Sequence, residues 1–219
     1  EVFGKNVLLQ FEDFNSNDAF PLLAEYRDKY LTYNDDIQGS AAVAVAGLLG
    51  AVKLQKPECQ DLIGELRKQT FLFHGAGSAN LGTVALLADE AGVPRSQIFV
   101  TNSRGVIWMS ADGKEGSFRN DEQKAFAQIG RPGFKQDLKS IVEAVRPSVL
   151  IGAVGRDPGC FNKDVVEALC KANPIQRPVV FAMSNPKTQA EITSKNAYTW
   201  SEGRVIYGSG TQMEPVEIA

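Results

Sequence analysis

Continuous apolar runs alternate with helical segments through most of this chain, and this alternation is the feature that most limits its possible folds. Apolar runs typical of buried strands lie at 69–74 (QTFLFH), 97–102 (QIFVTN), 148–153 (SVLIGA), 178–183 (PVVFAM) and 204–208 (RVIYG). The segments between them predict helices at 79–91, 134–145, 163–172 and 189–198. Apolar strands divided by helices form a parallel sheet covered on both faces. The sequence therefore predicts an α/β fold with a doubly wound parallel sheet.

The first part of the chain has a different pattern. An apolar run at 6–11 predicts a buried strand, and apolar residues at helical spacing predict a helix at 19–30. The polar stretch 32–40 (TYNDDIQGS) predicts a loop, and Ser40 is suited to cap the Ala-rich helix that follows. Residues 103–132 are rich in Gly and charge, so we expect a long excursion there.

A glycine-rich turn follows the strand at 69–74. Gly75 permits a tight turn, and Gly77 lets a pyrophosphate approach the backbone. The helix that begins near Ser78 and Ala79 aims free N–H groups and its positive dipole end at the phosphates. Three positions after Gly77 the usual fingerprint has Gly or Ala, whereas this chain has Asn80. The variant pattern predicts a Rossmann-type dinucleotide site, with an ordinary strand–helix turn as the alternative.

The end of the next strand bears on the choice between NAD and NADP. An acidic residue there would hydrogen-bond the ribose 2′-hydroxyl of NAD, but this chain has Asn102. Asn102 can bind a hydroxyl and does not repel a 2′-phosphate, and Arg104 is near enough in sequence to bind one. Both cofactors remain open, with NADP slightly favoured. A solvated loop charge is the alternative interpretation of Arg104.

Two acidic clusters precede the glycine turn. Glu12 and Asp13 follow the strand at 6–11, and Asp35 and Asp36 lie in the loop before the Ala-rich helix. Three or four carboxylates form a hard oxygen site that suits Mg²⁺ or Mn²⁺, while these clusters lack the histidine and cysteine ligands of a zinc site. Two solvated acidic turns would have the same sequence pattern.

A Ser-Asn-Pro stretch follows the strand at 178–183, at what should be the ligand-binding carboxyl edge of the sheet. Asn185 in this stretch could hydrogen-bond a substrate carboxylate or the nicotinamide amide. A plain turn would also explain it.

Composition excludes several classes of partner. The formal net charge of −3 gives no basic surplus for nucleic acid, and no apolar run reaches the length of about 20 residues that a membrane span needs. The cysteines, Cys59, Cys160 and Cys170, are odd in number and widely spaced, which indicates reduced thiols in the cytoplasm or an organelle matrix. The only histidine, His74, follows an apolar run, so we expect a structural role for it.

These motifs resemble, in this order, those of malic enzymes. The resemblance rests on LLQFEDF, YNDDIQGSAAVAVAGLL, HGAGSANLG, SVLIGAVG and FAMSNPKTQAE, and the pair FEDF and NDDIQG is its most specific part. It covers essentially the whole chain, more loosely at 103–128. It implies that residues 1–39 end a substrate- and metal-binding domain, and that 40–219 form a truncated NAD(P)-binding Rossmann domain.

The resemblance also implies roles for single residues and a reaction. Glu12, Asp13 and Asp36 match the divalent-metal ligands, and Asp35 matches an acid that supports the catalytic lysine. Asn185 matches a residue that contacts substrate and nicotinamide. The remaining cofactor contacts implied by the resemblance lie in three places. They are Ser40, the turn at Gly75 and Gly77 with the helix start at Ser78, Ala79 and Asn80, and a second turn at 152–155 that includes Val154 and Gly155. The implied reaction converts L-malate and NAD(P)⁺ to pyruvate, CO₂ and NAD(P)H.

Two other interpretations stay open. The chain could be another NAD(P)-dependent dehydrogenase, of the type that acts on amino acids, or a nucleotide-binding module without catalysis. Both ends of the chain look cut, and the sequence shows no targeting segment. We therefore expect a fragment of an enzyme that is a homo-oligomer when complete. The family's proton-transfer tyrosine and lysine should precede Glu1, so the isolated chain should bind a dinucleotide weakly without decarboxylating malate.

Overall fold

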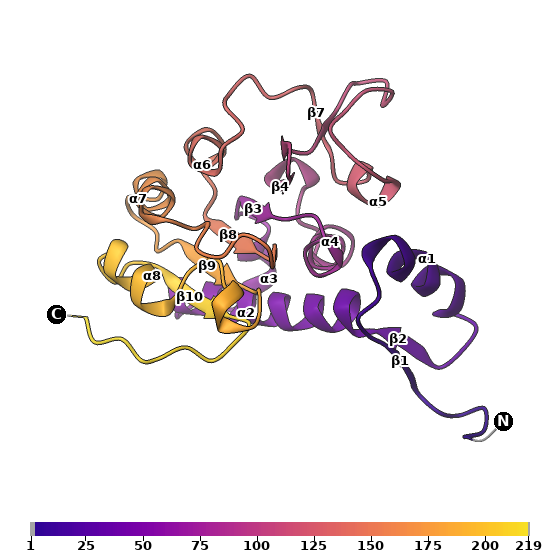
Figure 1. The fold of residues 1–219 in the computed structure, drawn as a ribbon. Helices are drawn as coiled ribbons and strands as arrows, with labels where there is room; N and C mark the ends of the chain where they lie inside the picture. Colours follow the sequence, from indigo (N-terminus) through magenta and orange to yellow (C-terminus); the bar gives the residue numbers. More distant parts are fainter. Residues whose placement is uncertain (1–2, 219) are drawn as a thin grey trace.

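The computed structural model describes residues 3–218, which form a six-stranded sheet with helices on both faces and a smaller N-terminal unit (Figure 1). The strand order is β10-β9-β8-β3-β4-β5. All neighbouring strands are parallel except β4 and β5. The strands are β3 (Phe71–His74), β4 (Ile98–Asn102), β5 (Gly105–Val106), β8 (Val149–Gly152), β9 (Val179–Ala182) and β10 (Ile206–Ser209). This confirms the predicted doubly wound α/β fold and adds an antiparallel edge strand.

Alternate strand residues supply two hydrophobic layers, because successive side chains of a strand point to opposite faces. Phe71 and Phe73 belong to the layer under α2 (Ser40–Gln55), α3 (Leu62–Leu66) and α4 (Ser78–Ala85). Leu72 and Leu150 belong to the layer under α6 (Leu138–Val145), α7 (Lys163–Ala172) and α8 (Ser194–Trp200). The helix of α4 continues as a wider π-type turn, η2 (Leu86–Glu90).

The beginning of the Ala-rich helix differs from the prediction. Residues Thr32–Asn34 form a strand, β2, which pairs in parallel with β1 (Leu9–Phe11). A π-type turn, η1 (Asp35–Gly39), then runs directly into α2. The N-cap is Asn34, whose side chain accepts a 2.9 Å hydrogen bond from the Ile37 N–H. Ser40 is therefore inside a continuous helix, and its predicted capping role was wrong because the buried Asn34 takes that role earlier in the chain.

Other helices also begin at residues different from those predicted, directly after a side chain that caps them. Helix α1 (Ser16–Tyr26) begins earlier than predicted, after Asn15, whose side chain accepts from the Asn17 N–H. Helices α6 and α8 begin later than predicted, because Asp137 and Thr193 cap them. The long excursion contains small elements of its own, namely β6 (Trp108–Met109), α5 (Asp121–Lys124) and β7 (Gln128–Ile129). The short helices η3 (Arg95–Gln97) and η4 (Lys187–Gln189) precede β4 and α8.

One helix, Asp35–Gln55, is long and apolar enough by length and composition to cross a membrane. One side of it packs into the molecule through Ala44, Leu48 and Val52, as a core helix does. Its glycine Gly47 lies against the sheet, where an added Cβ would come within 3.0 Å of the Phe181 ring. The expected absence of a membrane partner stays a prediction.

Candidate functional site

The strand order creates a crevice at the carboxyl end of the sheet. From β3 the chain passes to β4 on one side, whereas β8, the other neighbour of β3, lies on the opposite side. Ligands of open α/β sheets bind where the strand order diverges in this way. The crevice lies between the turns that follow β3 and β8, and its cleft has a volume of about 760 Å³.

The turn after β3 contains two glycines with different requirements. Gly75 has a φ of +101°, and a Cβ there would lie 2.8 Å from the carbonyl oxygen of Ala153. Gly77 has an ordinary extended conformation, and the atom nearest to an added Cβ is Ser16 Oγ at 4.0 Å. The protein itself therefore requires glycine at position 75, whereas a small residue at position 77 keeps the cleft open to a ligand.

The helix that follows this turn presents its N-terminus to the cleft. Ser78 and Ala79 are its first residues, and Gly77 precedes them without a side-chain cap, which leaves the first N–H groups free for an anion. Asn80 is 2% exposed, and its amide donates to the carbonyls of His74 and Gly75 at 3.0 and 2.8 Å. Asn80 thus holds the turn from beneath, and its contact with the cofactor stays a prediction.

Asn102 and Arg104, the residues predicted to lie near the ribose, line two separate hollows. The Asn102 amide group donates to the Ser117 carbonyl and to Gln123 Oε1, and its oxygen accepts from the Arg104 N–H. Asn102 lines the cleft, but its amide group is already hydrogen-bonded to residues of the segment 103–132. Arg104 lines a separate hollow, whereas Arg119 lines the cleft of about 760 Å³.

The predicted acidic residues converge in space. Glu12, Asp13 and Asp36 each offer a carboxylate oxygen, and these oxygens lie within 4.8 Å of one another. Asp13 has a left-handed φ of +59°, and its N–H donates to Asp36 Oδ2 at 2.8 Å. This bond ties the segment after β1 to the first turn of η1. The three carboxylates come from two segments, the residues after β1 and the first turn of η1, and the backbone brings them to one point.

The acidic cluster opens onto the same surface as the glycine turn. Asp13 and Asp36 line a cleft of about 360 Å³ together with Gly77 and Ser78. The Ser16 and Ser78 hydroxyls lie 2.9 Å apart, so the first turns of α1 and α4 are in direct contact. A metal ion on the carboxylates and a phosphate group on the turn would therefore be neighbours.

Asp35 and Ser40 occupy the helix that begins beside the acidic cluster. The Asp35 side chain lies over Gly39, where an added Cβ would come 2.1 Å from Asp35 Oδ1. Gly82 in α4 packs just as closely, because a Cβ added there would lie 2.3 Å from the Ile37 carbonyl oxygen. Two glycines thus allow η1 to pack against α4. Ser40 follows η1 and is not among the residues that line the cleft of about 760 Å³.

A buried glutamate that the sequence reasoning missed joins the second turn to β9. Glu191 is 0% exposed, and its Oε1 accepts from the Val154 N–H at 3.0 Å. It also accepts from the Ser184 N–H and hydroxyl, and Ser184 Oγ accepts from the Gly155 N–H at 2.9 Å. Asn185 follows directly and is exposed. The signal for Glu191 was available, since an acid stands between the apolar residues Ala190 and Ile192.

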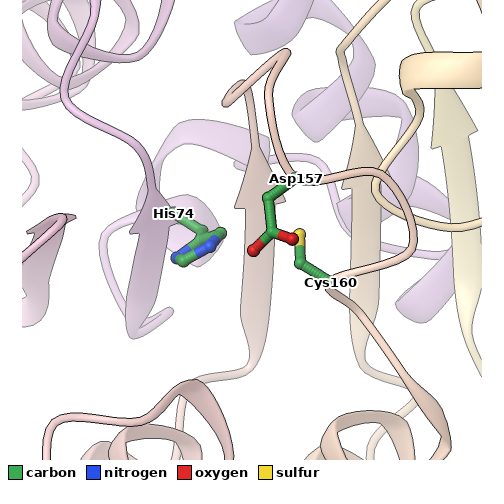
Figure 2. A group of neighbouring side chains, drawn as sticks. All are labelled: His74, Asp157 and Cys160. Atoms are coloured by element: carbon green, nitrogen blue, oxygen red, sulfur yellow. The ribbon is translucent and has the colours of Figure 1, made fainter.

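A second cluster of metal-ligand types was not predicted. His74, Asp157 and Cys160 each offer one ligand atom, and these atoms lie within 4.8 Å of one another (Figure 2). Burial lowers the pKa of the His74 imidazole, although the Asp157 and Glu191 carboxylates oppose this shift. Burial raises the pKa of the Cys160 thiol to about 12. All three cysteines are free thiols, as expected.

Comparisons with known proteins identify the family of this chain. The protein-family model described as the malic enzyme NAD-binding domain matches residues 37–219 of this chain. NADP-dependent malic enzyme 1 of Arabidopsis thaliana is 42% identical over 225 residues, which cover 98% of this chain and 36% of that protein. A chloroplastic NADP-dependent malic enzyme of Zea mays is 39% identical, over 99% of this chain and 33% of its own length. The chain thus spans about a third of the length of these relatives.

Solved structures share the fold. The Entamoeba histolytica malic enzyme superposes with a TM-score of 0.71 at 23% identity, over 93% of this chain and 38% of that one. An NAD-dependent malic enzyme of Thermotoga maritima gives a TM-score of 0.72 at 22% identity, over 96% and 50% of the two chains. The family model covers most of the sequence, and curated relatives match nearly all of it. The chain belongs to the malic enzyme family.

Proposed function

We propose that this chain serves the oxidative decarboxylation of L-malate to pyruvate and CO₂, with NAD(P)⁺ as hydride acceptor and Mg²⁺ or Mn²⁺ as the metal. The observation that carries the proposal is that Asp13 and Asp36 share one cleft with Gly77 and Ser78. Oxidation of a hydroxy acid by a dinucleotide requires the substrate carbon to lie beside the nicotinamide. A metal site and a phosphate-binding turn in one cleft support that arrangement.

The donor atoms of the acidic cluster fit a hard divalent cation. Glu12, Asp13 and Asp36 would hold the ion through carboxylate oxygens, the ligands that Mg²⁺ and Mn²⁺ prefer. When bound, such an ion supplies Lewis-acid polarisation of the substrate oxygens. Asp36 Oδ2 already accepts the Asp13 N–H, so this bond orients the Asp36 carboxylate. In the same scheme Asp35 supports a catalytic lysine.

The dinucleotide would lie along the carboxyl edge of the sheet. The pyrophosphate would face Gly75, Gly77 and the N-terminus of α4, whose free N–H groups and dipole favour an anion. The turn with Val154 and Gly155 would contact the cofactor from β8, since Val154 lines the same cleft. Asn185, at the end of β9, would contact the substrate and the nicotinamide.

The chain also offers a site for the NADP 2′-phosphate. The guanidinium of Arg119 donates to the Ser103 hydroxyl, directly after β4. Both residues line the dinucleotide cleft at the strand end where the ribose is read. We propose Arg119, in place of Arg104, as the cation that binds this phosphate. The relatives named NADP-dependent malic enzymes support NADP as the cofactor.

Mn²⁺ binding to acid-to-amide variants tests the proposal. Asp13→Asn and Asp36→Asn should each weaken Mn²⁺ binding by this chain, measured by calorimetry. In the complete enzyme, the same substitutions should lower Mn²⁺-supported malate oxidation by more than about a thousandfold, since Lewis-acid help contributes several kcal/mol. Asp28→Asn removes an equal charge from an exposed site and is the control. The binding measurement needs no turnover by the chain. Near-normal Mn²⁺ affinity in both cluster variants would refute the assignment.

A further inference from the structure

The cluster of His74, Asp157 and Cys160 combines three different ligand chemistries at one point. His74 ends β3, while Asp157 and Cys160 belong to the loop between β8 and α7 (Figure 2). The imidazole, carboxylate and thiol ligand atoms are within 4.8 Å of one another. Ligands of a tetrahedral zinc ion lie about 3.5 Å apart, given metal–ligand bonds of about 2.0–2.3 Å. Closing the cluster around an ion therefore needs only small side-chain movements.

Hydrogen bonds fix the loop that carries two of the three ligands. The Gly159 N–H donates to the Ala190 carbonyl at 3.0 Å, and the Phe161 N–H donates to the Glu191 carbonyl at 3.0 Å. The Cys160 N–H donates to the Asp157 carbonyl, which folds these two residues into one turn. The Phe161 side chain is 0% exposed and anchors the end of the loop in the core. The loop thus presents Asp157 and Cys160 to His74 in a defined arrangement.

A hydrogen bond to the neighbouring strand orients the histidine. His74 Nδ1 lies 2.9 Å from the Thr101 hydroxyl on the neighbouring strand β4. Histidines that bind metals usually hydrogen-bond through the ring nitrogen that does not face the ion, and this bond sets the ring orientation. The contact with Thr101 leaves Nε2 as the ring nitrogen free to bind an ion.

We propose that His74 Nε2, the Asp157 carboxylate and Cys160 Sγ form a second metal site, which takes Zn²⁺ or a similar thiophilic divalent cation. Three protein ligands of N, O and S type leave a fourth tetrahedral position open. The site differs in chemistry from the all-carboxylate cluster of Glu12, Asp13 and Asp36, which suits hard cations. As the metal–sulfur bond forms, Cys160 releases its proton to the buffer, and no electrons are transferred.

The position of the site gives it a consequence for cofactor binding, which rests on the proposed function. His74 and Asp157 line the dinucleotide cleft together with Gly75 and Gly77. An ion held there would occupy space beside the pyrophosphate turn. Zn²⁺ should therefore compete with NADP⁺, while Mn²⁺ on the carboxylate cluster should not.

Cobalt(II) substitution tests the site directly, without dinucleotide or malate. Co²⁺ added to the protein should give the intense near-ultraviolet charge-transfer band of a cobalt–thiolate bond. Cys160→Ser should abolish this band, whereas Cys59→Ser and Cys170→Ser should retain it, because those thiols lie outside the cluster. A wild-type protein without the band, or a band that survives Cys160→Ser, would overturn the proposal.

Zinc affinity supplies the second measurement and guards against misfolding of one variant. His74→Asn and Asp157→Asn keep the thiol and should each weaken Zn²⁺ binding at least about tenfold, the lower bound for losing even an indirect metal partner. The Mn²⁺ affinity of each variant serves as the internal control for folding. Unchanged zinc affinity in both variants would overturn the site.

Competition with NADP⁺ is then measured for each protein against its own zinc-free affinity. Zinc should weaken NADP⁺ binding in the wild type and not in Cys160→Ser. If zinc binds through Cys160 but NADP⁺ does not bind at all, the proposed function fails while the metal site stands. If both bind without competition, the placement of the dinucleotide beside His74 is wrong.

Discussion

At the residue scale, local patterns predicted the types of the important side chains but not their surroundings. The motif assigned Gly75 to a tight turn, and of the two motif glycines only Gly75 has a positive φ and a backbone oxygen in the path of a Cβ. Asn80 departs from the usual fingerprint, and the structure shows that its amide donates to two carbonyls of the turn. His74, Asp157 and Cys160 form a cluster through loop geometry, which no spacing in the sequence encodes.

The two glycines should therefore respond differently to substitution by alanine. Gly75→Ala should lower the free energy of unfolding by about 1–3 kcal/mol, because it combines a left-handed backbone with a contact at 2.8 Å. Gly77→Ala should change the free energy of unfolding by less than about 1 kcal/mol, since its backbone is compatible with alanine. It should nevertheless weaken NADP⁺ binding at least about tenfold, because the new methyl group occupies the cleft. Denaturant titration and calorimetry measure the two effects, and a Gly77→Ala protein that binds NADP⁺ normally would contradict this account.

At the element scale, long periodic segments were predictable and short polar ones were not. The range of α7 matches the prediction, because its apolar periodicity and Asn162 cap agree. Strand β2 was predicted as loop, since Thr32–Asn34 has no apolar pattern and exists by pairing with β1. The close contact of η1 with Gly82 of α4 is a tertiary feature, and it determines where Asp36 lies. The excursion after β4 likewise decides which arginine faces the cleft.

Arg119, in the segment after β4, leads to a prediction about the preference for NADP⁺ over NAD⁺. Arg119→Gln should lower kcat/KM or affinity for NADP⁺ by about tenfold to a hundredfold, because a charge-assisted hydrogen bond to the 2′-phosphate contributes about 1.5–3 kcal/mol. Binding of NAD⁺, which lacks this phosphate, should change little. Arg104→Gln removes an equal charge from the neighbouring hollow and is the matched control. Equal losses for the two cofactors, or a larger effect of Arg104→Gln, would show that the 2′ group is read elsewhere.

At the scale of the whole molecule, the candidate site joins two units of the fold. The acidic cluster belongs to the small β1-β2 unit and the first turn of η1, whereas the glycine turn belongs to the six-stranded sheet. The hydroxyls of Ser16 and Ser78 join these units, and residues of both units line one cleft. Sequence patterns predicted the acidic cluster and the glycine turn, but only the packed structure shows how close together they lie. This proximity has an electrostatic consequence, because three carboxylates then lie beside the place of an anionic pyrophosphate.

We expect Mn²⁺ and NADP⁺ to strengthen each other's binding for this reason. Without a cation, the carboxylates of Glu12, Asp13 and Asp36 repel the cofactor phosphates across the cleft, and a bound divalent ion removes that repulsion. Mn²⁺ should raise NADP⁺ affinity by about fivefold or more, and linkage requires NADP⁺ to raise Mn²⁺ affinity by the same factor. Calorimetric titrations of each ligand with and without the other measure both factors. Asp36→Asn should abolish the coupling, and this variant also controls for Mn²⁺ that binds free NADP⁺ in solution. Independent binding of the two ligands in the wild type would mean that the carboxylates and the phosphates lie too far apart, or are too well screened, to interact.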